Sequence, residues 1–260
     1  MRTTAAITLR EETLQSDEDK KDRVSFNIAL DPTDPDDRTK MYVVKFAAGS
    51  AEDWLKFRKE AQSIVEAKTW TGNAGAQFRM YSLLLKDDAK TKFIAQVPQV
   101  GVTTALIDAG LEYMTRLDYL PIECAKNTVA YLNQVTKPRD LSVAEFLNRI
   151  KIINSYLPLM PPPSNVSLTE EQLTALVERA VPGNWYRQFQ LQQTLGATQP
   201  TLTTLIQYFK VCEVQDPPSH DTRKQQKGHG GGDNDSGDST RSAKRSGRNQ
   251  GGHRGRTAGR

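Results

Sequence analysis

Two periodicities of apolar residues divide the chain into a short β-prone part and a long helical part. Residues 24–30 alternate apolar and polar side chains, and residues 41–46 are rich in β-branched and aromatic side chains. The Asp- and Pro-rich residues 31–37 between them are typical of a turn. This pattern predicts a β-hairpin with a long loop. From Ser50 onward the apolar residues recur about every 3.6 positions, which predicts amphipathic helices.

Four helices are predicted in the first half of the chain. The first begins at Ser50, whose side chain suits an N-cap, and the second follows Gly75. The third spans about residues 102–117. The fourth opens at Pro121, because the missing N–H of proline costs nothing in a first helical turn. We expect residues 24–136 to form one helical domain that begins with the hairpin. The residues expected to face its core are Trp54, Phe57, Ala61, Ile64, Val65, Phe78, Tyr81, Leu84, Leu85, Leu106, Ala109, Tyr113, Ile122, Ala125, Val129 and Leu132.

Four more helices are predicted after Pro138, which interrupts the helical pattern because the residue before a proline is pushed out of the α region. Capping boxes at Ser142 and Thr169 start the first two of them. The next is expected to be capped by Asn184, and the last to start near Thr201. The expected core residues are Val143, Phe146, Leu147, Ile150, Ile153, Leu157, Leu173, Leu176, Val177, Ala180, Trp185, Phe189, Leu195, Leu202, Leu205, Ile206 and Phe209.

The expected fold class is mostly α, with two small helical domains, a short N-terminal β-hairpin and disordered termini. Residues 137–216 make up the second, four-helix domain. Residues 1–23 are polar and mixed in charge, so we expect a flexible arm there. Residues 217–260 are rich in glycine and basic residues and lack apolar residues for a core, so we expect a disordered tail.

The charge of the chain is concentrated in this tail. Residues 217–260 carry ten Lys or Arg against four Asp, whereas the formal net charge of all 260 residues is only +4. A mobile, one-signed segment of this kind is typical of nonspecific binding to a polyanion such as RNA. The candidate nucleic-acid-binding residues are Arg223, Lys224, Lys227, Arg241, Lys244, Arg245, Arg248, Arg254, Arg256 and Arg260.

The sequence offers little catalytic chemistry. Cys124 and Cys212 are too few and too far apart for a zinc site, and all three histidines lie in the tail, where nothing orients an imidazole. No phosphate-binding or dinucleotide-binding glycine motif is present. The Asp-Ser-Gly tripeptide at residues 235–237 resembles that of retropepsins, but its polar neighbours favour a linker. We therefore expect no enzyme activity, no cofactor, no metal and no small-molecule substrate.

Other candidate binding residues have simpler interpretations. Trp54 and Trp185 lie on apolar helix faces, which favours core packing over base stacking, and the place of Trp70 after the first helix leaves both interpretations open. Basic residues of the body are interleaved with acidic ones and are interpreted as solvated helix faces; they include Lys56, Arg58, Lys59 and Arg149.

No segment suggests a membrane or a secretory route. No apolar run approaches the roughly 18 to 20 residues that span a bilayer, and the N-terminus shows neither a secretory signal nor a myristoylation signal. We expect a soluble intracellular protein, located in the cytoplasm or also in the nucleus.

Four motifs follow one another after residue 136: KPRDLSVAEFLNR at 137–149, INSYLP at 153–158 with prolines after it, an acidic capped helix that ends in Val181-Pro182 before Asn184-Trp185, and TLTTLIQYF at 201–209. Their order resembles the capsid region of Gag polyproteins from Ty3/gypsy-like LTR retrotransposons. Upstream, GSAEDWLKF at 49–57 is similar to the first capsid helix of that family.

This resemblance implies a two-domain helical capsid fold that associates with copies of itself. Phe146 and Arg149 match the C-terminal part of the capsid major homology region, with Asp140 near its acidic position, whereas Thr136 and Lys137 replace its Gln-Gly pair. The zinc knuckle, protease and reverse transcriptase that usually follow in such proteins are not in this sequence.

The resemblance also suggests a self-association surface. In these capsid domains the second helix of the C-terminal domain makes a two-fold contact, and residues 169–181 hold that position here. Val177 and Val181 lie at the edge of the apolar arc of this helix, so they are the candidate contact residues. The alternative is that both valines complete the core of their own domain.

Three functional hypotheses follow. The first is a Gag-like structural protein that self-associates through its helical domains and binds RNA nonspecifically through its tail. The second is a host-adopted, Gag-derived adaptor that keeps the helical domains for protein interactions. The third is a helical RNA-binding protein that does not assemble.

Overall fold

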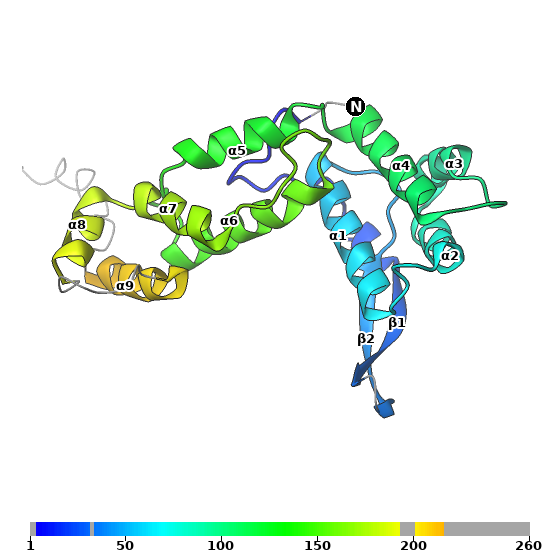
Figure 1. Cartoon of the computed structure of the whole chain (residues 1–260), viewed down its shortest axis with the longest axis horizontal. Helices are drawn as coiled ribbons and strands as arrows, with labels where there is room; N and C mark the ends of the chain where they lie inside the picture. The colour runs from blue at the N-terminus through cyan, green and yellow to red at the C-terminus, as the bar shows by residue number, and fades with distance from the viewer. Residues whose placement is uncertain (1–3, 32–33, 193–200, 216–260) are drawn as a thin grey trace, which may run out of the picture. The chain divides into compact units, whose positions relative to one another are not determined.

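The computed structural model describes residues 4–31, 34–192 and 201–215, and these residues confirm the predicted fold class (Figure 1). They are mostly helical, with one two-stranded antiparallel sheet near the N-terminus. The α-helices are α1 (Ala51–Ala67), α2 (Ala74–Leu84), α3 (Asp87–Gln96), α4 (Thr104–Met114), α5 (Cys124–Gln134), α6 (Val143–Tyr156), α7 (Glu170–Ala180), α8 (Gly183–Gln192) and α9 (Leu202–Gln215). A π-helical segment extends α4 over Thr115–Tyr119, and 3-10 turns occupy Asp19–Lys21 and Leu157–Leu159.

The hairpin is longer than the sequence predicted. Strand β1 (Arg23–Asp31) pairs with β2 (Asp34–Val44), with Phe26 opposite Met41 and an irregularity near the turn. The predicted long loop is wrong, because most of its Asp- and Pro-rich residues belong to β2. Both strands of a two-stranded sheet are edge strands, and the outer side of each makes no hydrogen bond within the sheet. A proline whose nitrogen faces that outer side therefore removes no hydrogen bond between the strands.

Aromatic side chains join the hairpin to the helices. Phe46, just after β2, accepts and donates main-chain hydrogen bonds between α2 and α3: its N–H donates to Leu84 O (2.8 Å) and its carbonyl accepts from Lys86 N (2.9 Å). Its ring lies 5.1 Å from that of Trp54, which stacks on Tyr119 at 5.1 Å. These buried rings form the centre of the first core, as predicted for Trp54.

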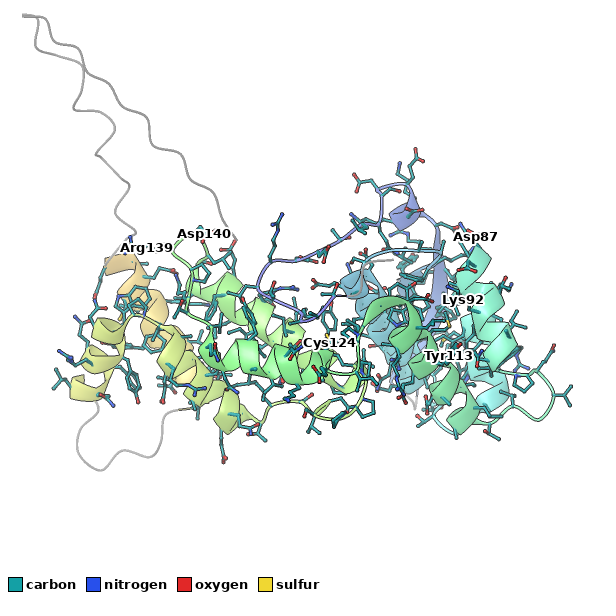
Figure 2. All side chains as sticks on the ribbon, turned by 90° about the horizontal axis from the view of Figure 1, so that it is seen from above. Asp87, Lys92, Tyr113, Cys124, Arg139 and Asp140 are labelled. Atoms are coloured by element: carbon teal, nitrogen blue, oxygen red, sulfur yellow. The ribbon has the colours of Figure 1, made fainter. Side chains whose placement is uncertain are left out.

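The expected faces of α1 and α2 are confirmed, but α3 was missed. Ser50 and Asp53 form a complete capping box at the start of α1, and Asn73 caps α2. Helix α3 buries only Ala89 and Phe93, which is too sparse an apolar pattern to reveal a helix. Lys92 of α3, labelled in Figure 2, reaches both carboxylate oxygens of Asp118 at 2.9 and 3.0 Å and so ties α3 to the π-helical segment.

The helices after Pro138 follow the sequence prediction closely. Both predicted capping boxes are complete, at Ser142 and at Thr169, and the expected apolar faces of α6 and α7 are buried. The rings of Trp185 and Phe209 pack at 6.5 Å between α8 and α9. Helix α8 begins at Gly183, so Asn184 lies inside the helix rather than at its cap. The predicted core residue Leu195 lies outside the described residues.

The described residues between 4 and 215 belong to one compact unit. The predicted boundary near Lys137 stays a prediction. The N-terminal residues differ from the flexible arm expected for residues 1–23, because residues 4–14 make specific bonds to the helices. Ile7 is buried, and its N–H donates to Thr128 Oγ1 (3.0 Å).

Candidate functional site: a buried arginine network and an exposed helix face

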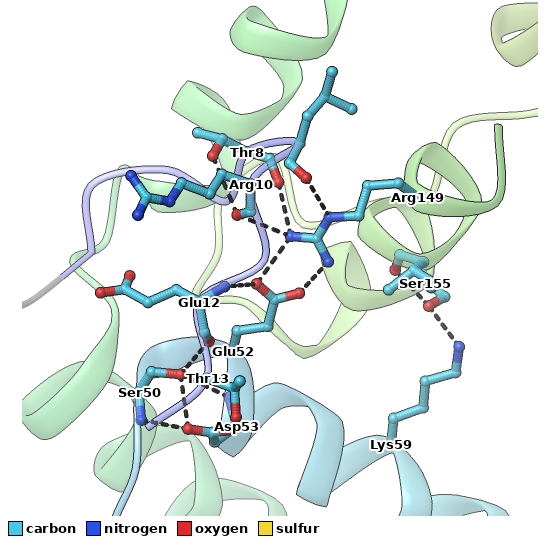
Figure 3. A network of polar contacts seen from close by, with 12 residues as sticks. Thr8, Arg10, Glu12, Thr13, Ser50, Glu52, Asp53, Lys59, Arg149 and Ser155 are labelled. Atoms are coloured by element: carbon cyan, nitrogen blue, oxygen red, sulfur yellow. Dashed lines mark hydrogen bonds and ion pairs between the residues drawn. The ribbon is translucent and has the colours of Figure 1, made fainter. Parts of the chain in front are cut away.

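Arg149 of α6 is the centre of a buried polar network (Figure 3). Its guanidinium forms a two-pronged ion pair with Glu52 of α1, with Nη1 on Oε1 and Nη2 on Oε2 (2.9 Å). It also donates to the carbonyls of Leu9 (3.1 Å), Thr8 (2.7 Å) and Arg10 (3.3 Å). The residue is only 7% exposed, so the interpretation of Arg149 as a solvated helix face was wrong.

The network continues into the first turn of α1. Glu12 N donates to Glu52 Oε2 at 3.0 Å, Thr13 Oγ1 to Asp53 Oδ1 at 2.6 Å, and Leu14 N to Asp53 Oδ2 at 2.7 Å. Burial raises the pKa of Asp53, but the hydrogen bonds that its carboxylate accepts outweigh burial and hold this pKa below its ordinary value. Residues 8–14 therefore bind across the start of α1 and the middle of α6, which joins segments far apart in the sequence.

The network joins residues 8–14 to α1 and α6. The carboxylate of Glu52 is occupied by the guanidinium of Arg149 and by the N–H of Glu12. Sequence reasoning missed Glu52 altogether. An acidic residue is common in a first helical turn, so nothing in the sequence indicated that Glu52 has a buried partner.

Helix α4 exposes the apolar face that the sequence predicted to be buried. Leu106, Tyr113, Leu117 and Ile122 are 38%, 46%, 54% and 47% exposed, and Ala109 between them is also exposed. Figure 2 marks Tyr113 on this helix. We call these five residues the α4 face. A hollow of ≈ 680 Å³ lies along part of it, bordered by Ala109, Tyr113, Leu117, Pro121 and Ile122 with the charged Glu112 and Arg116.

The structure shows why the prediction of this face was wrong. The opposite side of α4 carries its own apolar row, and Ile107, Leu111 and Met114 are buried. Gly110 determines which of the two rows is buried, because a Cβ at this position would collide with Val97 at the end of α3. The lack of a side chain at Gly110 lets α4 pack closely there. A glycine in the middle of a helix was the signal in the sequence that could have identified the buried side.

The residues predicted for self-association are buried rather than at the surface. Val177 and Val181 are 1% and 6% exposed, and they pack in the same core as Leu173 and Leu176. This burial agrees with the alternative in which both valines complete the core, so we do not carry them forward as contact residues.

The remaining candidates are accounted for as follows. Trp54 and Trp185 are buried in the core, and Trp70 is partly buried against it. Cys124 and Cys212 are buried, unpaired thiols, and burial raises the pKa of Cys124 to about 11. The ten basic tail residues, the three histidines and residues 235–237 lie outside the described residues.

The described residues hold neither a metal-binding cluster nor a membrane-spanning helix. In residues 4–31, 34–192 and 201–215, no group of three or more His, Cys, Asp or Glu side chains could hold a metal ion. No helix within the same ranges is both long and apolar enough to cross a membrane.

Comparison with known proteins adds no relative. No protein-family model matches this chain, and neither a curated protein nor a solved structure matches it significantly.

Proposed function

We propose that this chain is a Gag-like structural protein of a Ty3/gypsy-like LTR retrotransposon, which associates with copies of itself through its helical body and binds RNA nonspecifically through its basic tail. The observation that carries the proposal is the α4 face, a row of exposed apolar side chains that includes Leu106, Tyr113 and Leu117. Contiguous exposed apolar surface of this kind is typical of protein contacts. The protein would act without catalysis, in the cytoplasm or the nucleus.

The partner that fits the α4 face best is a second copy. When two such helices pack antiparallel about a two-fold axis, residues equidistant from the axis in sequence lie opposite each other. An axis at the level of residue 114 places Glu112 of one copy opposite Arg116 of the other. Within one chain these two charges already form a pair at 3.6 Å, and the same groups can pair between copies.

The size of the face suits a weak contact. Four large side chains that are 38% to 54% exposed give a modest apolar area, and small interfaces are typical of transient association. RNA that binds several tails at once would raise the local concentration of the bodies and so favour assembly. Assembly dependent on RNA is therefore expected.

Sedimentation velocity and electron microscopy of the full chain, with and without RNA, test the assembly. Leu117→Asp should abolish concentration-dependent association, because a charge in an apolar contact must be desolvated. Leu83→Asp is the matched control, since Leu83 of α2 is exposed to nearly the same extent (51%) and lies outside the α4 face. Association of Leu117→Asp equal to that of the unaltered chain would contradict the self-association proposal.

The RNA half of the proposal is tested by salt dependence. If the tail engages about four to six phosphates, the logarithm of the association constant should fall against log salt with a slope of about −3 to −5 on single strands. A chain that ends at Asp216 should bind RNA weakly or not at all. Full affinity and an unchanged slope in that shorter chain would contradict a role for the tail.

Both alternative functions differ from assembly in the same measurements. A host-adopted adaptor would use the α4 face for another protein, and a helical RNA-binding protein would not assemble. In either case the pure chain would stay monomeric with RNA, show no particles, and sediment alike with or without Leu117→Asp.

A further inference from the structure

The two faces of the β-hairpin differ in chemistry. In an antiparallel pair, residues directly opposite each other lie on the same face, and successive residues alternate between the faces. On one face Ile28 and Val43 are 5% and 1% exposed, and Val24, Phe26 and Met41 pack against the same core. Helix α1 contacts both strands. The other face therefore points away from this core.

The outward face of the hairpin is polar, basic and aromatic. Its exposed residues are Arg23, Ser25, Asn27 and Ala29 on β1, and Arg38, Lys40 and Tyr42 on β2. We call these residues the hairpin face. The register places Ser25 opposite Tyr42 and Asn27 opposite Lys40. Three of the residues are cations and none is acidic, so the face is one-signed in charge.

Tyr42 is the aromatic residue of the hairpin face. It is 50% exposed, and the guanidinium of Arg23 lies over its ring at 4.7 Å from the centroid. This cation–π contact holds Arg23 beside the ring. Because half of Tyr42 remains exposed, the ring offers surface on which a base can stack next to a positive charge.

The positive charge of the hairpin face is not neutralised by nearby carboxylates. Arg23 and Lys40 form no ion pair with any residue in the described part of the chain. By contrast, Lys45 and Lys86 both pair with Asp22, at 3.1 and 2.7 Å. Cations that the protein leaves unpaired are the ones that phosphates can neutralise with release of counterions.

The spacing along β2 suits a single strand of nucleic acid. Lys40 and Tyr42 are two positions apart on the same face, which separates them by about 6.6 Å. A phosphate beside the lysine and the base of an adjacent nucleotide on the ring are compatible with this separation. The turn residues 31–37 contain four aspartates, which repel phosphates. The contact is therefore restricted to the part of the hairpin nearer the helices.

We propose that the hairpin face is a second RNA contact, which binds a single strand with a base stacked on Tyr42 and phosphates beside Arg23 and Lys40. An exposed aromatic ring among unpaired cations is the combination that single-strand binding uses. An acidic protein surface would use the charges but not the ring. This inference rests on the proposed RNA binding and divides that binding between the tail and the body.

Photochemical crosslinking of the full chain to oligouridine, followed by mass spectrometry, locates the contact. A crosslink is expected on Tyr42 as well as in the tail, and none on residues 31–37. Leu117→Asp should keep the crosslink on Tyr42, so a failure of self-association does not affect this result. Crosslinks confined to the tail would overturn the proposal.

Two variants of Tyr42 separate the ring from its hydroxyl. Tyr42→Ala should weaken binding of oligouridine by the full chain about fivefold, the effect of losing one stacked base. Tyr42→Phe keeps the ring and should bind as the unaltered chain does. Both should keep the circular dichroism of the unaltered chain, because the residue is half exposed. Unchanged binding by Tyr42→Ala, or equal losses for the two variants, would overturn the proposal.

Charge variants measure the phosphate contacts. On single strands, each phosphate contact contributes about 0.7 to the slope of the logarithm of the association constant against log salt. Arg23→Gln combined with Lys40→Gln should therefore reduce this slope by about 1.4. Lys56→Gln combined with Lys90→Gln is the matched control and should leave the slope unchanged. These exposed lysines of α1 and α3 lie outside the hairpin, and their replacement changes the net charge equally.

The outcomes separate the hairpin face from the tail. Equal slopes for the two double variants, with RNA still bound, would overturn the hairpin contact and leave the proposed function standing. No binding of RNA by the full chain would overturn both. A loss of self-association in the hairpin variant, without a change of slope, would make the face a protein contact and would also overturn the proposal.

Discussion

Helix α4, before Pro138, differs from α6 and α7, after it, in whether the apolar face expected from the sequence is buried. After Pro138, the expected apolar faces of α6 and α7 are buried, including Val177 and Val181. Before it, α4 turns an equally regular apolar row outward. The comparison teaches that periodicity identifies a buried face only where a helix has one apolar arc. Where it has two, packing partners decide which arc is covered.

The second apolar arc of α4 is therefore the more informative surface for function. Val177, predicted as a contact from the resemblance, is buried in the core, whereas Leu117, predicted only as the end of a helix, is exposed and available to a partner. The same side-chain chemistry has opposite consequences in the two places.

The largest effect is expected for an aspartate introduced at Val177. An unpaired carboxylate at this buried position should destabilise the protein by about 4 kcal/mol or more and remove cooperative unfolding of α6 to α9. Leu117→Asp should change the free energy of unfolding by no more than about 0.5 kcal/mol, since its side chain is already in water. Denaturant titration followed by circular dichroism compares them. Equal destabilisation by the two variants would remove the distinction between the two regions.

The buried ion pair that joins the two regions should give the next largest effect. Arg149→Ala leaves Glu52 buried without its cation, and breaking a buried pair in this way typically costs about 3 to 5 kcal/mol. Arg139→Ala is the control, because Arg139 is exposed in the loop before α6 and should cost no more than about 0.5 kcal/mol. Chemical denaturation measures both, and a small loss for Arg149→Ala would mean that water replaces the pair.

Acid should weaken the attachment of the N-terminal segment through Asp53. Its pKa is lower in the folded chain than the ordinary 3.8, so the folded state holds fewer protons and the stabilisation is complete above that value. The stabilisation is lost as the pH falls through the folded pKa. Asp53→Asn should therefore flatten the dependence of stability on pH below about 4. If the variant lost stability in acid as much as the unaltered chain does, other carboxylates would be responsible for the acid sensitivity.

The smallest effects are expected at two helix caps, one with local bonds alone and one that also contacts the N-terminal segment. Ser142→Ala removes a cap whose bonds are all within residues 142–145, and it should cost about 1 kcal/mol. Ser50→Ala removes a comparable cap and also the bond from Ser50 Oγ to Glu12 O (2.6 Å), so it should cost more. Thermal melts of the two variants make the comparison. Equal losses would show that the N-terminal segment contributes nothing to this cap.

Much of the fold could be predicted because its signals are local. The capping boxes at Ser50, Ser142 and Thr169 join residues three positions apart, so the sequence alone determined where α1, α6 and α7 begin. The single apolar arcs of α6 and α7 determined their buried sides, and the alternation in residues 24–30 determined β1. Composition alone also determined the concentration of positive charge after residue 216.

The rest depended on contacts between distant parts of the chain. The burial of Arg149 requires the carbonyls of Thr8, Leu9 and Arg10, about 140 positions earlier, and no local pattern brings them to α6. The outward turn of the α4 face required the close approach of Gly110 to Val97. A local hydrogen bond constrains only its own few residues, whereas competition between two apolar faces is settled by the whole packed core, so only the tertiary structure decided these features.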